Sequence, residues 1–183
     1  MINIKIDDAK ARVVIQGIEA RSRNLASPMR KIATELANSV QENFDVGGRY
    51  SAPGSIMGGD KKWDAVKKPP MYAGGRQKGK EKGTTLDRAG HLRRSIHEDS
   101  DDNSASLETS MVYARIQNNG GTTKPHEIRA RNGRALAFAS GGEKVLVKKV
   151  KHPGSKIAAR PYMVIQDDDI DYAKQTILDH LTD

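Results

Sequence analysis

The side chains best suited to chemistry form a basic cluster between residues 60 and 82. This segment holds eight Lys or Arg residues and three acids, a local charge of +5. Such side chains attract phosphate groups without reading bases, so the cluster predicts contact with a nucleic-acid backbone. Docking on an acidic protein partner and a solvated loop are the alternatives. Trp63 and Tyr72 add the hypothesis of base stacking. The candidate DNA- or partner-contacting residues are Lys61, Lys62, Lys67, Lys68, Arg76, Lys78, Lys80 and Lys82.

Patterns of catalysis and metal binding are missing from the sequence. None of the five histidines lies four residues from another, and there is no phosphate loop, dinucleotide fingerprint or Gly-x-Ser-x-Gly motif. The acidic runs 98–102 and 167–171 lack the alternating ligands of a calcium loop. With no cysteine there is neither a thiol nucleophile nor a disulfide. We therefore expect a protein that is not an enzyme and has no cofactor and no metal site.

Composition predicts one domain, residues 1–183, rich in loops. The chain has 31 Lys or Arg against 23 acids, a net charge of +8, with 36% hydrophobic and 4% aromatic residues. Both fractions are low for a compact enzyme with a deep core. No apolar run approaches the roughly 18 residues of a membrane-spanning helix, and the start MINIKIDD lacks the basic and apolar regions of a signal peptide. We expect a soluble protein without a membrane partner.

Two segments have the spacing of amphipathic helices. Residues 28–44 place apolar side chains at i, i+3 and i+4, and Ser27 followed by Pro28 predicts the helix start. A second helix is expected from Arg160 onward, with three Asp residues at 167–169 in its first turn.

The N-terminal residues are less clear. Residues 2–6 alternate like a strand, and Asp7 or Asp8 is a candidate helix cap. Residues 9–25 are compatible with a helix, whereas a strand through 12–16 is the alternative.

The rest of the chain reads as short elements and loops. Residues 45–85 contain nine glycines and three prolines without a sustained period, which predicts a flexible basic insertion or arm. Farther on, a short helix or turn is expected at 91–96 and a helix at 112–117. A turn is expected at 98–103, and strands at 104–110, 127–130, 135–139 and 144–150. The predicted fold class is α+β: an antiparallel sheet of short strands packed with N-terminal and C-terminal amphipathic helices.

An ordered set of motifs carries a family resemblance. The motifs are TLDRAGHLRRSI (85–96), VYARIQNNGG (112–121), IRAR (128–131), ALAF (135–138), HPG (152–154) and ARPY (159–162). In this order and spacing the chain resembles the phage virion morphogenesis family of Mu-like tailed phages, which includes tail-completion proteins. The resemblance runs from about residue 28 to the end. Relatives commonly carry His-Gln where this chain has Gln117-Asn118, and the 45–85 segment is longer than the family core requires.

The resemblance implies a structural protein of virion assembly. It implies tail completion or head–tail joining in the neck, by copies forming a ring of six- or twelve-fold symmetry around the DNA channel. The partners would be further copies, neighbouring neck, tail or connector proteins, and packaged DNA in non-specific contact. Assembly would occur in the host cytoplasm, and the protein would then belong to the virion. A tail terminator, a head-assembly factor and a basic nucleic-acid-binding accessory protein are the alternatives.

The same motifs suggest which residues face a partner. The candidate interface residues are Arg93, Arg94, Tyr113 and Arg160. Their apolar neighbours Leu92 and Ile96 are expected in the core.

Overall fold

A single long helix, α2 (Ala26–Val46), is the axis of the molecule. The computed structural model describes residues 8–64, 86, 90–131, 135–140 and 143–183. The predicted apolar stripe of α2 is confirmed, since Met29, Ile32, Val40 and Phe44 are all buried. The helix ends at Gly47, whose left-handed φ of 76° suits a residue without Cβ. It begins earlier than predicted, because Leu25 occupies the N-cap position and Ser27 lies within the first turn.

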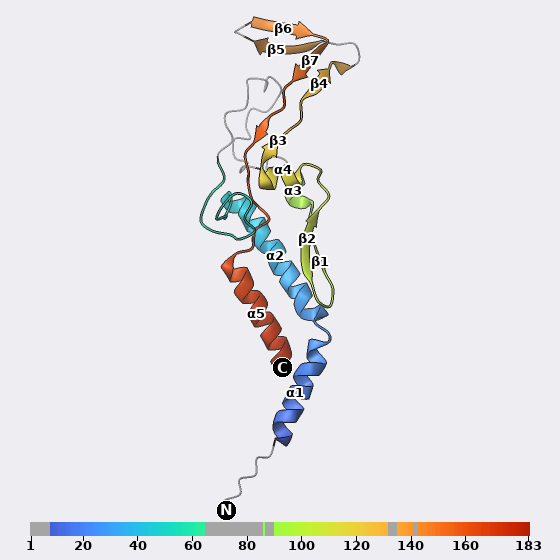
Figure 1. Cartoon of the computed structure of the whole chain (residues 1–183), viewed down its shortest axis with the longest axis vertical. Coiled ribbons are helices and arrows are strands. Elements are labelled where there is room, and N and C mark those ends of the chain that lie inside the picture. Colours follow the sequence, from blue (N-terminus) through green and yellow to red (C-terminus); the bar gives the residue numbers. More distant parts are fainter. Residues whose placement is uncertain (1–7, 65–85, 87–89, 132–134, 141–142) are drawn as a thin grey trace, which may run out of the picture.

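The N-terminal helix α1 (Ala9–Ser22) extends away from the rest of the described chain (Figure 1). The helical interpretation of this segment is confirmed, and the strand alternative at 12–16 is wrong. No residue of α1 is buried. Asp8 stands at the N-cap position but makes no side-chain cap, because its carboxylate pairs with Arg12 at 2.8 Å. The strand predicted at residues 2–6 lies outside the described residues.

The C-terminal helix α5 (Asp167–Thr182) packs along α2. The prediction that it begins at Arg160 is wrong, because Pro161 and Tyr162 are instead buried in non-helical chain. Asp169 and Gln166 form a capping box that fixes the helix start. The three predicted acids therefore do lie in the first turn, near the positive end of the helix dipole.

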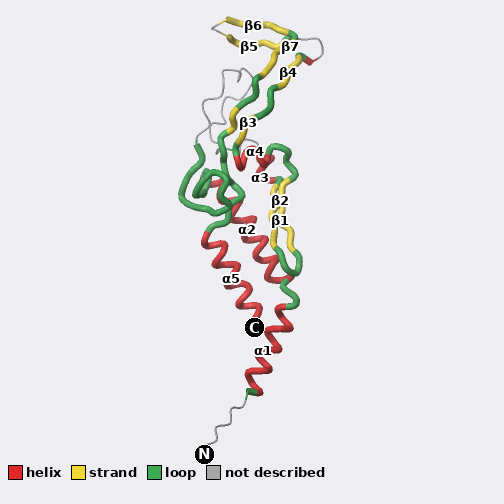
Figure 2. Tube along the Cα trace, in the orientation of Figure 1, coloured by secondary structure: helices red, strands yellow, loops and turns green. Residues whose placement is uncertain are grey.

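The described strands form four separate antiparallel pairs, β1–β2, β3–β8, β4–β7 and β5–β6 (Figure 2). One short helix precedes the strands, and a second lies between β2 and β3. In chain order these elements are α3 (His91–Arg94), β1 (Ile96–Ser100), β2 (Ala105–Thr109), α4 (Ala114–Asn119), β3 (Gly121–Thr122), β4 (His126–Arg129), β5 (Leu136–Ser140), β6 (Glu143–Val147), β7 (Lys149–His152) and β8 (Lys156–Ile157).

The core lies where α2 meets β1–β2 and the chain before α5. Leu92 and Ile96 are buried there, as predicted, beside Phe44 and Tyr162. The α+β class is thus confirmed. The β1–β2 hairpin packs on α2, whereas β4–β7 and β5–β6 extend beyond the helical body (Figure 1). The hairpin turn is shorter than predicted, because β1 continues to Ser100. The helix predicted at 112–117 begins two residues later, at Ala114.

Candidate functional site

Buried polar side chains hold the chain around Tyr162 in place. Asn43 is fully buried and donates from Nδ2 to the Tyr162 carbonyl at 2.8 Å. Asn118 Oδ1 accepts from the backbone N–H groups of Tyr162 and Met163 at 2.9 and 3.1 Å. These bonds satisfy backbone groups that no regular element pairs. The neighbouring Gln117 accepts the Arg160 N–H through its backbone carbonyl at 2.9 Å, so Asn118 is the residue of this pair whose side chain holds the Tyr162 segment.

Trp63 belongs to this core. The residue is only 6% exposed, and its indole N–H donates to the Pro161 carbonyl at 2.8 Å. Its ring packs edge-on against Phe44, with 5.7 Å between the ring centroids. A Cβ on Gly48 would lie 2.7 Å from the indole, so this close approach requires glycine. The hypothesis that Trp63 stacks on nucleic-acid bases is wrong. The first part of the predicted arm, up to Asp64, is instead anchored to the helical body.

The predicted basic cluster is described only at its start. Lys61 and Lys62 are both exposed, and Lys61 exchanges backbone hydrogen bonds with Tyr50 at 3.1 and 3.2 Å. Their contact with a partner or with DNA stays a prediction. The other members lie outside the described residues: Lys67, Lys68, Arg76, Lys78, Lys80 and Lys82. Tyr72 lies outside them too.

The four candidate interface residues lie in different settings. Arg93 binds Asp45 of α2 through two hydrogen bonds of 2.6 and 2.9 Å, which ties α3 to α2. Arg94 is exposed on the same short helix, and Tyr113 is 38% exposed at the start of α4. Arg160 is half-buried, and its Nε has no hydrogen-bond partner among the described residues. The contact of these four residues with a partner stays a prediction.

A second concentration of positive charge was missed by sequence reasoning. Residues 124–156 carry nine Lys or Arg against two Glu, more net charge than the 60–82 cluster. The described part of this segment consists largely of the pairs β4–β7 and β5–β6, which we call the distal ribbon (residues 126–131, 135–140 and 143–152). A charge count along the whole chain would have found the positive charge. What the count does not show is that four of these bases lie on the paired strands: Arg129, Lys144, Lys149 and Lys151.

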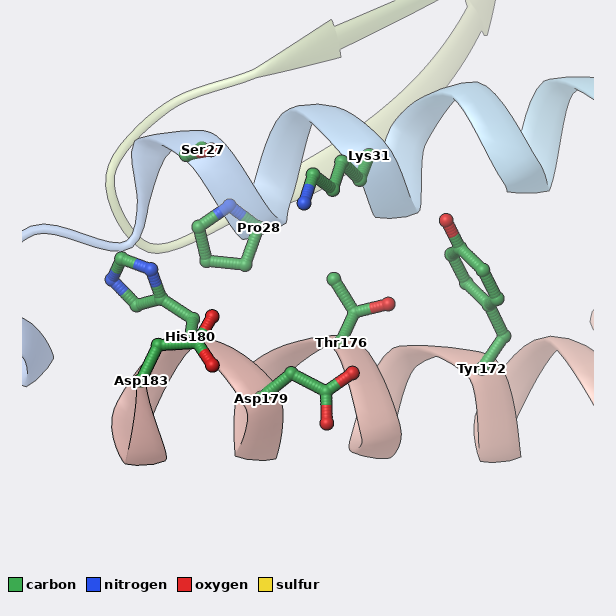
Figure 3. Close-up of a pocket in the computed structure, with 8 residues that line it drawn as sticks. All are labelled: Ser27, Pro28, Lys31, Tyr172, Thr176, Asp179, His180 and Asp183. Atoms are coloured by element: carbon green, nitrogen blue, oxygen red, sulfur yellow. The ribbon is translucent and has the colours of Figure 1, made fainter.

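The described residues contain no hollow with evident catalytic chemistry. A groove of about 230 Å³ lies between the start of α2 and the second half of α5 (Figure 3). It is lined by Pro28 and Lys31 from α2 and by Thr176, Asp179 and His180 from α5, among others. The His180 Nε2 lies 2.9 Å from the Asn24 carbonyl, so this ring helps to join α5 to the α1–α2 connection.

A second hollow, of about 510 Å³, has a mixed charge. Its lining includes Arg49, Asp60, Lys62 and Asp168. Within the described chain no three His, Cys, Asp or Glu residues are grouped to hold a metal ion. Burial raises the pKa of Tyr162 to about 12, and the charge of the nearby Tyr113 is a second, smaller cause of the rise. This tyrosine is a neutral core residue at physiological pH, not an activated base. None of the described helices is long and apolar enough to span a membrane.

The described chain thus combines a helical body that has a buried polar hub, an extending ribbon and exposed charged side chains. The sequence profile of the phage virion morphogenesis family matches residues 6–182, and the chain belongs to that family. It is therefore a phage structural protein that acts in virion morphogenesis. No curated protein and no solved structure matches the chain significantly.

Proposed function

We propose that this protein completes the tail or joins tail to head in the neck, as one subunit of a ring around the DNA channel. The observation that carries the proposal is family membership over nearly the whole chain. The shape supports it, since α1 and the distal ribbon extend from opposite ends of the helical body (Figure 1). Such extensions bury little surface within their own chain and suit a subunit that completes its burial against neighbours.

The exposed apolar side chains of α1 add to this support. Val13, Val14 and Ile15 are 69%, 59% and 63% exposed, three adjacent apolar residues on a helix with no buried position. Apolar surface of this kind commonly marks a contact with another protein. In the assembled neck these residues would lie against a neighbouring subunit or a tail protein.

Mass and particle binding test the proposal together. Light scattering or native mass spectrometry at low and high salt should give a discrete ring, or a monomer that joins purified tails or heads. A parallel titration with duplex DNA should show weak binding. A monomer that joins neither particle, and binds duplex DNA tightly with a steep loss as salt rises, would instead establish a nucleic-acid-binding accessory protein.

A deletion of residues 65–85 separates two origins of self-association. If the ring forms through the helical body or the ribbon, the deleted chain still associates. Loss of association with an unchanged far-UV circular dichroism spectrum would assign the contact to the basic cluster.

A further inference from the structure

The distal ribbon has apolar side chains that the described residues cover only in part. Ile128 is 37% exposed, and the others are half-buried: Leu136, Phe138, Val145, Val147 and Val150. In β5–β6, Leu136 lies opposite Val147 and Phe138 lies opposite Val145; in β4–β7, Ile128 lies opposite Val150. Directly opposed residues of an antiparallel pair share one face, so each section has an apolar side. The substantial contacts of these strands with described elements are those within each pair. A two-stranded ribbon is only marginally stable alone, which favours a partner that covers these faces.

The other face of β4–β7 is basic. Glu127 pairs with Arg129 at 2.6 Å and with Lys149 at 3.8 Å, and Lys151 lies opposite Glu127 in the register. One carboxylate thus stands among three cations. A partner for the ribbon therefore needs negative charge together with apolar side chains.

The exposed face of α5 offers this combination. Residues 167–183 carry six Asp and one Lys, and only Asp169 of the six is buried, where it accepts a hydrogen bond from Ser39 at 2.8 Å. Asp171 and Leu178 lie seven residues apart on one side of the helix, and Asp171 pairs there with Lys174 at 2.8 Å. Asp179 and Tyr172 lie between this side and the groove against α2 that they help to line (Figure 3), and Asp179 accepts a hydrogen bond from Gln175 at 2.6 Å. Leu178 and Tyr172 are 53% and 41% exposed.

From this complementarity we propose that the distal ribbon of one copy docks across the exposed face of α5 on a second copy. The proposal rests on the proposed function, because it supplies the contact between neighbouring ring subunits. In one chain the ribbon and α5 occupy separate parts of the molecule (Figure 1), so the contact joins different copies. This contact is head-to-tail. After one ribbon docks on one α5, the first copy still has a free α5 face and the second a free ribbon, so further copies can be added. The chain of copies closes into a ring if the rotation between neighbouring copies allows it.

Duplex DNA is the competing partner for the ribbon. Phosphate contacts would use the bases of β4–β7 and β6 but would leave the apolar pairs in water. An acidic protein surface with apolar side chains, such as that of α5, would contact the bases and also cover the apolar pairs, which favours a second copy over DNA.

A charge exchange on the full-length chain tests this contact. The ribbon variant carries Lys149→Glu and Lys151→Glu, and the helix variant carries Asp171→Lys and Asp179→Lys. The control carries Arg30→Glu and Arg115→Glu, two exposed bases outside the ribbon, α1 and α5. Self-association is measured by sedimentation velocity across a concentration series at low salt. Far-UV circular dichroism and Trp63 fluorescence check that each variant is folded.

We expect the ribbon and helix variants each to weaken self-association at least tenfold, and the control to match the original chain. A mixture of the two variants should recover association, because each then offers a surface opposite in charge to one on the other. The chain carrying all four substitutions should recover it as well.

Three results would overturn the proposal in different ways. Association that survives both variants would place the ring contact elsewhere and leave the proposed function intact. A chain that never associates and joins no particle would remove both. Ribbon variants that lose duplex DNA binding, measured by fluorescence anisotropy, but keep their self-association would assign the ribbon to DNA.

Discussion

Replacement of Trp63 with Ala tests whether the segment after α2 is part of the folded body. The substitution removes an indole that is 6% exposed, its contact with Phe44, and the donor to the Pro161 carbonyl. It removes no exposed surface of the predicted basic cluster. Its effect therefore separates a structural role for this segment from a binding role.

The expected loss of unfolding free energy is about 3–5 kcal/mol. Truncation of a buried Trp to Ala typically costs this much, because apolar contacts are lost and a cavity remains. Trp63→Phe keeps a ring and should cost about 1–3 kcal/mol, the usual penalty for leaving a buried polar group such as the Pro161 carbonyl without its partner. Domains are commonly stable by about 5–15 kcal/mol, so the Ala variant should lose a large share.

Urea unfolding followed by far-UV circular dichroism measures these losses. Val112→Ala is the matched control, because Val112 is 98% exposed and its truncation should change stability by less than about 0.5 kcal/mol. The chain has one Trp, so fluorescence of the unsubstituted protein reports this site alone. If Trp63→Ala were as mild as Val112→Ala, or if the native emission matched that of the unfolded chain, the anchoring of residues 47–64 would be refuted.

Three further predictions concern the hub and its surroundings. The pKa of Tyr162, raised from an ordinary 10.0 to about 12, means that its contribution to stability is complete below pH 10 and is lost as pH rises toward 12. Urea unfolding from pH 8 to 11 should show this fall, and Tyr162→Phe should reduce it. Asn118→Ala leaves the N–H groups of Tyr162 and Met163 without their acceptor and should cost about 1–3 kcal/mol in thermal or urea unfolding; a change within error would show that water replaces the side chain. Arg93→Ala breaks a partly exposed pair with Asp45 and a hydrogen bond to Gln41 Oε1, so it should cost about 1–2 kcal/mol; a larger loss would mean that these bonds also orient α3.

Local pattern was sufficient for much of the helical structure. The i, i+3, i+4 spacing in residues 28–44 found α2, because that helix buries one continuous stripe. Leu92 and Ile96 were predicted in the core from their apolar character, and both are buried. The start of α5 was placed too early, because Pro161 is as compatible with a first helical turn as with the buried non-helical chain that it forms here. Tertiary hydrogen bonds from Asn43, Trp63 and Asn118 decide between the two.

The distal ribbon shows a different limit. Its strands at 126–129 and 136–140 were predicted within one residue, and its charge is countable in the sequence. The single strand predicted at 144–150 is instead two strands, β6 and the first half of β7, separated at residue 148. The alternation of residues does not tell which pairs pack on a helix and which extend alone, because register and packing partners are set by residues far away in the chain. Among the described strand pairs, only β1–β2 packs substantially on α2. That the apolar pairs of the ribbon lack such a helix can therefore be seen only in the fold.

The sequence by itself thus determined the class of the fold, the net positive charge, the long helix α2 and the resemblance to a phage morphogenesis family. Each of these depends on composition, short-range periodicity or an ordered set of motifs. Only the tertiary structure decided that Trp63 is a core residue and that Arg129, Lys144, Lys149 and Lys151 lie on the strands of an extended ribbon. The reason is physical: burial and pairing depend on contacts between residues about 100 positions apart, such as Trp63 and Pro161, and no local pattern encodes them.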